Sequence, residues 1–250
     1  MITTNIPKLR QFYKIKAILF LSLIISTSSC AQLLQIVEQT PLSDLKLSQL
    51  DISNGLKGAL DKGVEKQVTK LTAIDGFLQN ELVKIVLPEE LQIIDTKLRQ
   101  IGLSSLADEG IKVLNRAAED AVKEATPIFT DAIKNLTFSD AKNILMGNNT
   151  AATTYLESST STALYSKFNP VIQNSFEKVG ATKVWSNIIS KYNKIPFVKK
   201  VNPNLTDYTT RKTMDGVFKM IAVEELSIRT TLNSRSTPIL KKVFALQDNR

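Results

Sequence analysis

The spacing of apolar residues most restricts what this 250-residue chain can fold into. Between residues 53 and 71, Leu56, Leu60, Val64, Val68 and Leu71 recur at steps of four, four, four and three. This spacing places the five side chains on one stripe of an amphipathic helix. Comparable spacing recurs along most of the chain. It predicts an all-α fold, a single irregular multi-helix domain with at most a minor β element.

Proline, glycine and capping residues predict where several helices begin and end. Pro88 is expected to open a helix, because its missing N–H needs no partner in the first turn. Gly102 suits the end of the same helix. Thr137, followed three residues later by Asp140, forms a capping-box-like pattern at the start of a short helix. That helix is expected to end at Gly147.

Two prolines lie inside longer helical patterns and are expected to interrupt them. Pro127 should kink or break the alanine-rich helix predicted over residues 104–136, and Pro170 should separate two further helices. Residues 84–87 form a short β-like run. Residues 194–205 are expected to be irregular, because they contain two prolines and two asparagines.

The first 29 residues differ in composition from the rest of the chain. Residues 1–16 carry four basic residues and no acid, and residues 17–25 (AILFLSLII) carry no charge. Small polar residues then lead to Cys30. This order is typical of a secretory signal peptide. The apolar run is too short for a membrane-spanning helix, which needs about 20 residues.

Cys30 is the single cysteine of the chain and follows the small residues STSS. STSSC resembles the lipobox of bacterial lipoproteins, in which cleavage precedes a cysteine that carries a diacylglyceryl group. It departs from the usual lipobox in having Thr27 where leucine is commonest. We predict lipid attachment at Cys30, which would fix the chain to a bilayer. Two alternatives stay open: cleavage after Ala31, releasing a soluble chain that starts at Gln32, or an uncleaved anchor.

These features divide the chain into three predicted parts. They are a lipoprotein-type signal peptide (1–29), a lipidated N-terminus with a short tether (30–43) and a helical domain (44–250). The tether reaches about 45 Å at most, because an extended residue spans ~3.4 Å. An anchored domain would therefore work near its membrane.

The residue inventory excludes several kinds of chemistry. The chain has no histidine, and a lipidated Cys30 would leave no free thiol. Ser-His-Asp and Cys-His catalysis, disulfides, and thiolate or histidine-rich metal sites are therefore excluded. We expect no metal and no cofactor, and an enzyme is the less favoured class of function.

The positive charge of the whole chain overstates that of the predicted mature chain. Four of its 32 basic residues lie in the signal segment, which leaves 28 basic against 24 acidic residues. A scattered excess of this size does not favour binding to nucleic acid, which needs a concentrated basic face. The densest basic cluster, around Lys199 and Lys200, favours a weak attraction to anionic headgroups, with solvated helix faces as the alternative.

Carboxylates at helical spacing are the best catalytic candidates. Asp131, with Asn135 four residues on and Asp140 after a turn, could bind a cation or form an acid–base pair. The alternative is that Asp140 only caps a helix. Glu224 and Glu225 are adjacent in sequence and should point in different directions, which disfavours a shared site. Glu119 is expected to lie on a solvated, ion-paired helix surface.

Aromatic residues at helical spacing are mostly core candidates. Trp185 and Tyr192 stand just before the proline-containing segment and are the candidates to line a ligand groove.

Several segments, in their order along the chain, resemble the domain-of-unknown-function family 4197. The most specific are PIFTDAIKNLTFSDA (127–141) and VNPNLTDYTT (201–210) followed by DGVF (215–218). The resemblance extends from about Asp44 to Phe244. It implies a secreted, mostly helical bacterial protein, often with a signal peptide. The family has no agreed activity, so the resemblance implies no catalytic residue.

These observations favour an envelope lipoprotein with a binding or structural role near the membrane. Its partners would be the membrane, through the lipid on Cys30, and an envelope protein, a glycan or a lipid. Its expected location is the outer membrane, facing the periplasm. The alternative function is a carboxylate-dependent envelope hydrolase that uses Asp131 and Asp140.

Overall fold

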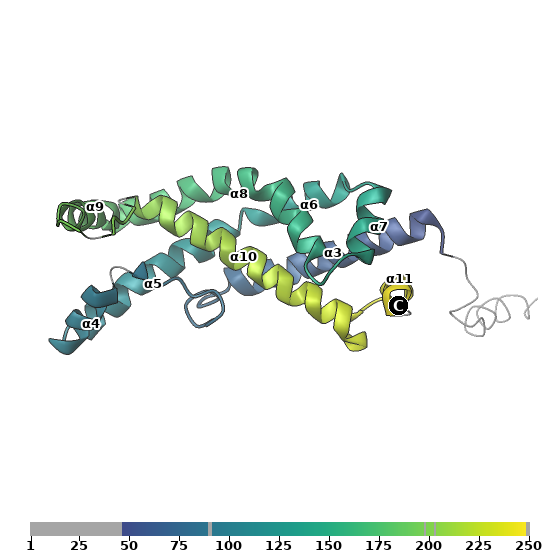
Figure 1. The fold of residues 1–250 in the computed structure, drawn as a ribbon, viewed down its shortest axis with the longest axis horizontal. Coiled ribbons are helices and arrows are strands. Elements are labelled where there is room, and N and C mark those ends of the chain that lie inside the picture. The colour runs from purple at the N-terminus through teal and green to yellow at the C-terminus, as the bar shows by residue number, and fades with distance from the viewer. Residues whose placement is uncertain (1–46, 90–91, 198, 203, 249–250) are drawn as a thin grey trace, which may run out of the picture. The chain divides into compact units, whose positions relative to one another are not determined.

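Helices and the turns between them make up the structure of residues 47–248, which the computed structural model describes apart from residues 90, 91, 198 and 203. No strand occurs among these residues, so the predicted all-α fold is confirmed. The helices, labelled in Figure 1, are α3 (Gln49–Thr72), α4 (Gln92–Gln100), α5 (Ser104–Val122), α6 (Ala125–Lys134), α7 (Phe138–Met146), α8 (Ala151–Lys178), α9 (Ala181–Tyr192), α10 (Leu205–Thr230), the 3₁₀ turn η2 (Leu232–Ser234) and α11 (Pro238–Asp248).

The predicted signal peptide, Cys30 and the tether lie outside the described residues. Within the described part, none of the helices is both long enough and apolar enough to cross a bilayer.

The main core forms where α8 and α10 pack side by side, with α5 and α6 against them (Figure 1). Phe168, Ile172 and Phe176 recur every four residues along α8 and have no exposed surface. Phe129 of α6 and Phe218 of α10 meet edge to face, with their ring centroids 6.1 Å apart. Each fully buried side chain of this size contributes about 1.5–3 kcal/mol to folding, so the stripe on α8 holds the bundle together.

A second apolar cluster joins α3, α7 and α11. Leu56, Leu145 and Val243 are buried in it. A glycine permits the close approach of α11, because a Cβ at Gly55 would lie 2.8 Å from Cγ2 of Val243. By contrast, a Cβ at Gly58 would meet no atom within 4 Å.

A buried ion pair on α10 binds the ends of two other helices. The Glu225 carboxylate accepts hydrogen bonds from the backbone N–H groups of Ala152 (2.9 Å) and Thr153 (2.8 Å) at the start of α8. Arg229 donates to Glu225 (2.7 Å) and to the carbonyl oxygen of Ile144 (2.7 Å) near the end of α7. These bonds satisfy helix-end groups that have no partner within their own helix, and they fix the α7–α8 connection to α10.

Most of the predicted helix ends are confirmed. Thr137 and Asp140 form a complete capping box at the start of α7, and Gly147 ends that helix. Gly102 follows the end of α4 with a φ of 82°, a left-handed conformation that suits glycine. The helix predicted to open at Pro88 begins later, because α4 starts at Gln92.

The two interior prolines have different effects. The predicted break near Pro127 is confirmed: α5 ends at Val122 and α6 begins at Ala125, so Pro127 is the third residue of α6, where a missing N–H costs little. The separation predicted at Pro170 is wrong, because α8 continues through it. An interior proline costs about 3 kcal/mol. Full burial of Phe168 and Ile172, on either side of Pro170, offsets that cost.

Gly216 lets α10 approach the turn that follows α3. A Cβ there would lie 2.9 Å from Cε1 of Phe77 and 3.2 Å from Cβ of Val83. Phe77 has no exposed surface and therefore has little room to shift.

We expect Gly216→Ala to destabilise the domain by about 1–3 kcal/mol, because the added methyl group overpacks the core. Gly58→Ala is the matched control. It should stabilise by about 0.5–1 kcal/mol, since alanine is the better helix former and the space is open. Urea unfolding of both variants measures the two changes. Equal changes in the free energy of unfolding would contradict the close approach at Gly216.

Candidate functional site

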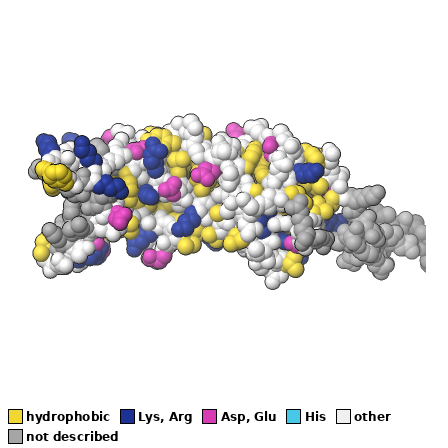
Figure 2. Space-filling model, viewed as in Figure 1, with side chains coloured by type: hydrophobic (Ala, Val, Ile, Leu, Met, Phe, Trp, Pro, Cys, Tyr) yellow, Lys and Arg dark blue, Asp and Glu magenta, His cyan; other side chains and the backbone are white. Residues whose placement is uncertain are grey.

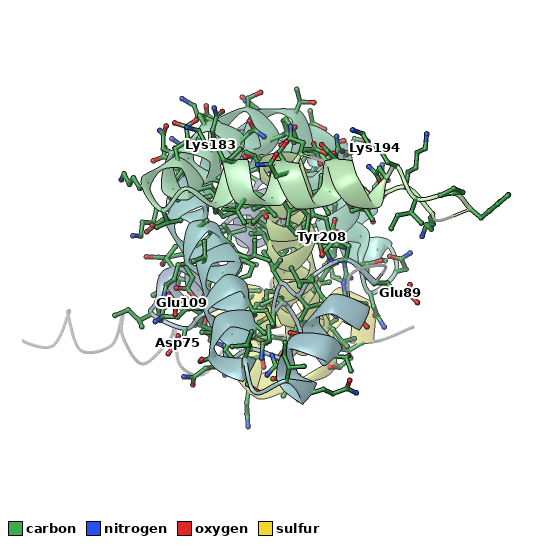
Figure 3. All side chains as sticks on the ribbon, turned by 90° about the vertical axis from the view of Figure 1, so that its left-hand side faces the viewer. Asp75, Glu89, Glu109, Lys183, Lys194 and Tyr208 are labelled. Atoms are coloured by element: carbon green, nitrogen blue, oxygen red, sulfur yellow. The ribbon has the colours of Figure 1, made fainter. Side chains whose placement is uncertain are left out.

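An apolar groove of about 400 Å³ lies at the end of the domain where α5 and α9 approach each other. Figure 3 faces this end, with α9 across the top and Glu109 of α5 below it. The lining residues come from α5, the α8–α9 turn, α9 and two flanking segments: Leu87, Glu109, Gly110, Val113, Leu114, Val179, Ala181, Val184, Trp185 and Leu205. Its size and largely apolar lining are those of a small-molecule site.

Trp185, a candidate from the sequence, lies on this groove, while the side chain of Tyr192 is outside the described part of the structure. Trp185 is 8 % exposed. Its indole N–H has no hydrogen-bond partner among the described residues, and neither has the buried hydroxyl of Thr182, three residues earlier on α9. Buried polar atoms are nearly always bonded, so these two atoms of α9 are exceptions among the described residues.

The wall of the groove opposite α9 depends on Asn115, which the sequence analysis did not single out. Its side chain accepts from the Ile85 N–H (2.8 Å) and donates to the Ile85 carbonyl oxygen (2.8 Å). A neighbouring strand would make the same two bonds. The Asn115 side chain takes its place, so the β-like run of residues 84–87 joins no sheet. Tyr208 donates to the carbonyl oxygen of Val86 (2.7 Å). Together these bonds hold Leu87 beside the groove.

The signal for Asn115 was present in the sequence. It stands among apolar positions of α5, with Leu114 and Ala118 buried beside it, and it is itself fully buried. A buried amide requires polar partners. Ile85, outside any helix, provides two of them, and the Ile111 carbonyl oxygen accepts a further bond from the Asn115 amide (2.7 Å).

The charged groups near the groove are paired and exposed. Glu109 lies 3.6 Å from Lys112, and Arg99 bonds to Asp95 (3.0 Å) and Asp108 (2.7 Å). Exposed pairs of this kind contribute little to stability. Glu109 is the one titratable side chain among the residues that line the groove. An acid or base acts only within hydrogen-bond reach of the proton it transfers, and Glu109 is the one side chain of the lining that could take that role.

The two candidate catalytic carboxylates lie on consecutive helices, Asp131 in the last turn of α6 and Asp140 in the first turn of α7. Asp131 is exposed on α6. Asp140 accepts hydrogen bonds from the Thr137 hydroxyl (2.6 Å) and the Thr137 backbone N–H (3.0 Å). These two bonds lower the pKa of the Asp140 carboxyl below its ordinary value. Neither carboxylate lines the groove, and Asp140 serves the start of α7.

The adjacent glutamates of α10 have separate partners, as their spacing predicted. Glu224 accepts from Lys66 (2.7 Å) and from the side-chain amide of Gln67 (2.6 Å) of α3. Glu225 binds the start of α8 instead. Both side chains tie helices together.

The prediction that Glu119 lies on a solvated helix surface is wrong, because its side chain is buried and only 4 % exposed. It accepts from the backbone N–H of Phe77 (3.2 Å) and pairs with Arg116, which also binds Asp75 (2.6 Å). Its burial is explained by these partners, which satisfy its charge and connect α5 to the turn after α3.

Comparison with known proteins assigns the chain to a family. The family model of proteins of unknown function called DUF4197 matches residues 46–245. The chain belongs to the DUF4197 family. No curated protein and no solved structure matches it.

Within the residues that the structure describes, the aspartate and glutamate side chains of this DUF4197 protein form no group of three that could hold a metal ion. Its groove therefore remains the candidate functional site.

Asp140 allows a test of its capping role. Asp140→Ala should destabilise the domain at neutral pH, because the carboxylate whose pKa is lowered by folding stabilises α7. This contribution is complete above the ordinary aspartate pKa of 3.8 and is lost as pH falls through the lower pKa of the folded state. The stability difference between Asp140→Ala and the native chain should therefore shrink in acid. Urea unfolding over this pH range measures it.

Asp131→Ala is the control, because Asp131 is exposed on the neighbouring helix. It should change the free energy of unfolding by less than about 0.5 kcal/mol. A loss at Asp140 that stays the same at every pH would contradict a role for its charge.

Proposed function

We propose that this protein is a lipid-anchored protein of the bacterial cell envelope whose helical domain binds the apolar chain of an amphiphilic ligand. The observation that carries the proposal is the groove between α5 and α9, about 400 Å³ in volume and lined by apolar side chains except for Glu109. The proposed location is the outer membrane, facing the periplasm, with Cys30 as the point of lipid attachment.

The lining of the groove supports an amphiphile as the occupant. Leu114 and Trp185 are buried within the lining and offer apolar surface, which favours a hydrocarbon chain. Val179 and Val184 are each 61 % exposed, so the mouth of the groove opens to water. A polar headgroup can stay solvated there while the chain is buried, which avoids the cost of burying an unpaired polar group. A lipid anchor would keep the domain close to a supply of such molecules.

A carboxylate-dependent hydrolase has less support from the geometry. Asp140 is engaged in the capping box of α7, and both Asp131 and Asp140 lie outside the lining of the groove. We therefore propose binding and not hydrolysis.

Gly110 offers a way to fill the groove without disturbing the fold. It lines the groove, and a Cβ there would meet no atom within 4 Å. Gly110→Leu should weaken the binding of palmitate by roughly 10- to 100-fold, the equivalent of the 1–3 kcal/mol that overpacking costs. Trp185 is the only tryptophan of the chain, so its intrinsic fluorescence reports a palmitate titration directly.

Gly58→Leu is the matched control, since Gly58 also lies in open space within a helix but away from the groove. It should bind palmitate as the native chain does. Two results would contradict the proposal: no saturable change in Trp185 fluorescence with palmitate, or equal affinity in the two leucine variants.

The anchor is tested separately. Mass spectrometry of the mature N-terminus should find an acylated Cys30, and Cys30→Ala should release the protein from membranes into the soluble fraction, because one covalent attachment supplies the lipid. An unmodified chain beginning at Gln32 would contradict the anchor and leave the groove proposal unaffected.

A further inference from the structure

The segment between Glu177 and Asp207 contains no acidic residue. This segment includes α9 and the loop after it, and it carries the lysines Lys178, Lys183, Lys191, Lys194, Lys199 and Lys200. The positive charge is only slightly in excess over the whole chain, but in this segment it is concentrated, at one end of the domain. Figure 2 shows hydrophobic and basic side chains close together at this end.

The loop after α9 presents large apolar side chains to water. Phe197 is fully exposed, at 107 % of its reference surface, and Ile195 is 53 % exposed. Phe197 also has a φ of 66°, a left-handed conformation that is unfavourable for a bulky residue. Phe197 therefore contributes no apolar burial to the stability of the domain, while its backbone conformation is unfavourable.

The base of the loop is held in place. The side chain of Asn193 accepts from the Val201 N–H (2.9 Å) and donates to the Val201 carbonyl oxygen (2.8 Å). Val201 is buried, so these bonds fasten both ends of the loop to the domain. The loop therefore projects from a fixed base. Figure 3 shows it extending beyond Lys194, while Lys183 lies at the other end of α9.

We infer that this loop, with Lys183 of α9, docks on an anionic phospholipid surface. We call Lys183, Lys194, Ile195, Phe197 and Lys200 the basic–aromatic face. Lysines are attracted to anionic headgroups, and an exposed aromatic side chain can insert at the boundary between headgroups and acyl chains. The combination favours a bilayer over an acidic protein, because Ile195 and Phe197 stand exposed on one loop between lysines, where they can insert between headgroups.

Three acidic side chains at the same end are each paired with a basic residue, which weakens their repulsion of an anionic surface. Asp95, Asp108 and Glu109 lie on α4 and α5 and are paired with Arg99 or Lys112. In Figure 3, Glu109 and Glu89 lie below α9, away from Lys183 and Lys194. The basic–aromatic face needs neither the lipid on Cys30 nor a ligand in the groove, so it can be tested alone.

The test uses residues 31–250, which leave out the signal segment and Cys30 and so remove the lipid from the measurement. It should co-sediment with vesicles of phosphatidylcholine and phosphatidylglycerol but not with phosphatidylcholine alone, and salt should weaken binding. Replacing Lys183, Lys194 and Lys200 together by glutamine should reduce binding on the order of 100-fold, because each lysine near an anionic surface accounts for roughly fivefold.

The control replaces Lys62, Lys70 and Lys142, exposed on α3 and α7, by glutamine. It removes the same charge and should bind almost as the native chain does. Equal loss in both triple variants would overturn the assignment, since net charge alone would then explain binding. Binding to soluble polyglutamate but not to anionic vesicles would also overturn it, in favour of an acidic protein partner.

Phe197→Asn tests the aromatic contact without endangering the fold, because asparagine tolerates the left-handed conformation. It should reduce vesicle binding about tenfold through lost apolar burial, with no loss of thermal stability, and unchanged binding would overturn the insertion of Phe197. Gly110→Leu should bind vesicles normally, and the lysine variants should keep their palmitate affinity. These two results separate a failure of docking from a failure of the groove.

Discussion

The buried ion pair between Glu225 and Arg229 is the interaction on which the arrangement of the long helices depends. Two charges removed from water are costly unless every oxygen and N–H finds a partner. Here the partners are the first N–H groups of α8 and the last carbonyl groups of α7, which themselves lack partners within their helices. One set of bonds therefore offsets the desolvation of the Glu225 carboxylate, the Arg229 guanidinium and the helix-end groups of α7 and α8. Arg235 plays a similar part at the end of α10. It donates to the carbonyl oxygens of Ile228 and Arg229 and pairs with Asp248 of α11.

The two ends of the domain consequently differ in character. Figure 1 places α7 and α11 at one end of the domain and α9 at the other. Near the first end, the buried Glu225–Arg229 pair is bonded to the end of α7 and to the start of α8. The end that holds α9 has an open apolar groove, and Trp185 and Thr182 keep buried polar atoms without partners among the described residues. Stability is not uniform across a structure, and binding elements are drawn from its less stable parts. The binding role proposed for the groove beside α9 agrees with this rule.

Helix ends could be predicted from the sequence, because residues a few positions apart determine them. Features that depend on contacts between residues far apart in the sequence could not. The capping box at Thr137 involves residues three apart, so its pattern is readable in one dimension. Pro170 was misleading because the burial that offsets its cost comes from α5 and α10, far away in sequence. The same applies to Glu119, whose partner Phe77 lies 42 residues earlier, and to Asn115, whose partner lies 30 residues earlier. The groove forms only when α5 and α9 come together, and the sequence does not show that they do. Trp185 was therefore the only residue of its lining that the sequence singled out.

The two faces of α9 explain why a groove and a basic–aromatic face occur together. Its inner side contributes Ala181 and Trp185 to the groove, and Lys183 and Lys194 lie exposed near its two ends. Val184 belongs to the lining and is also largely exposed, so the mouth of the groove opens beside the lysines. An amphiphile has the same division, with an apolar chain and a headgroup that is often anionic. If the lysines bring this end of the domain to a lipid surface, a chain can pass from bilayer to groove with little exposure to water, which removes the main free-energy barrier to its transfer.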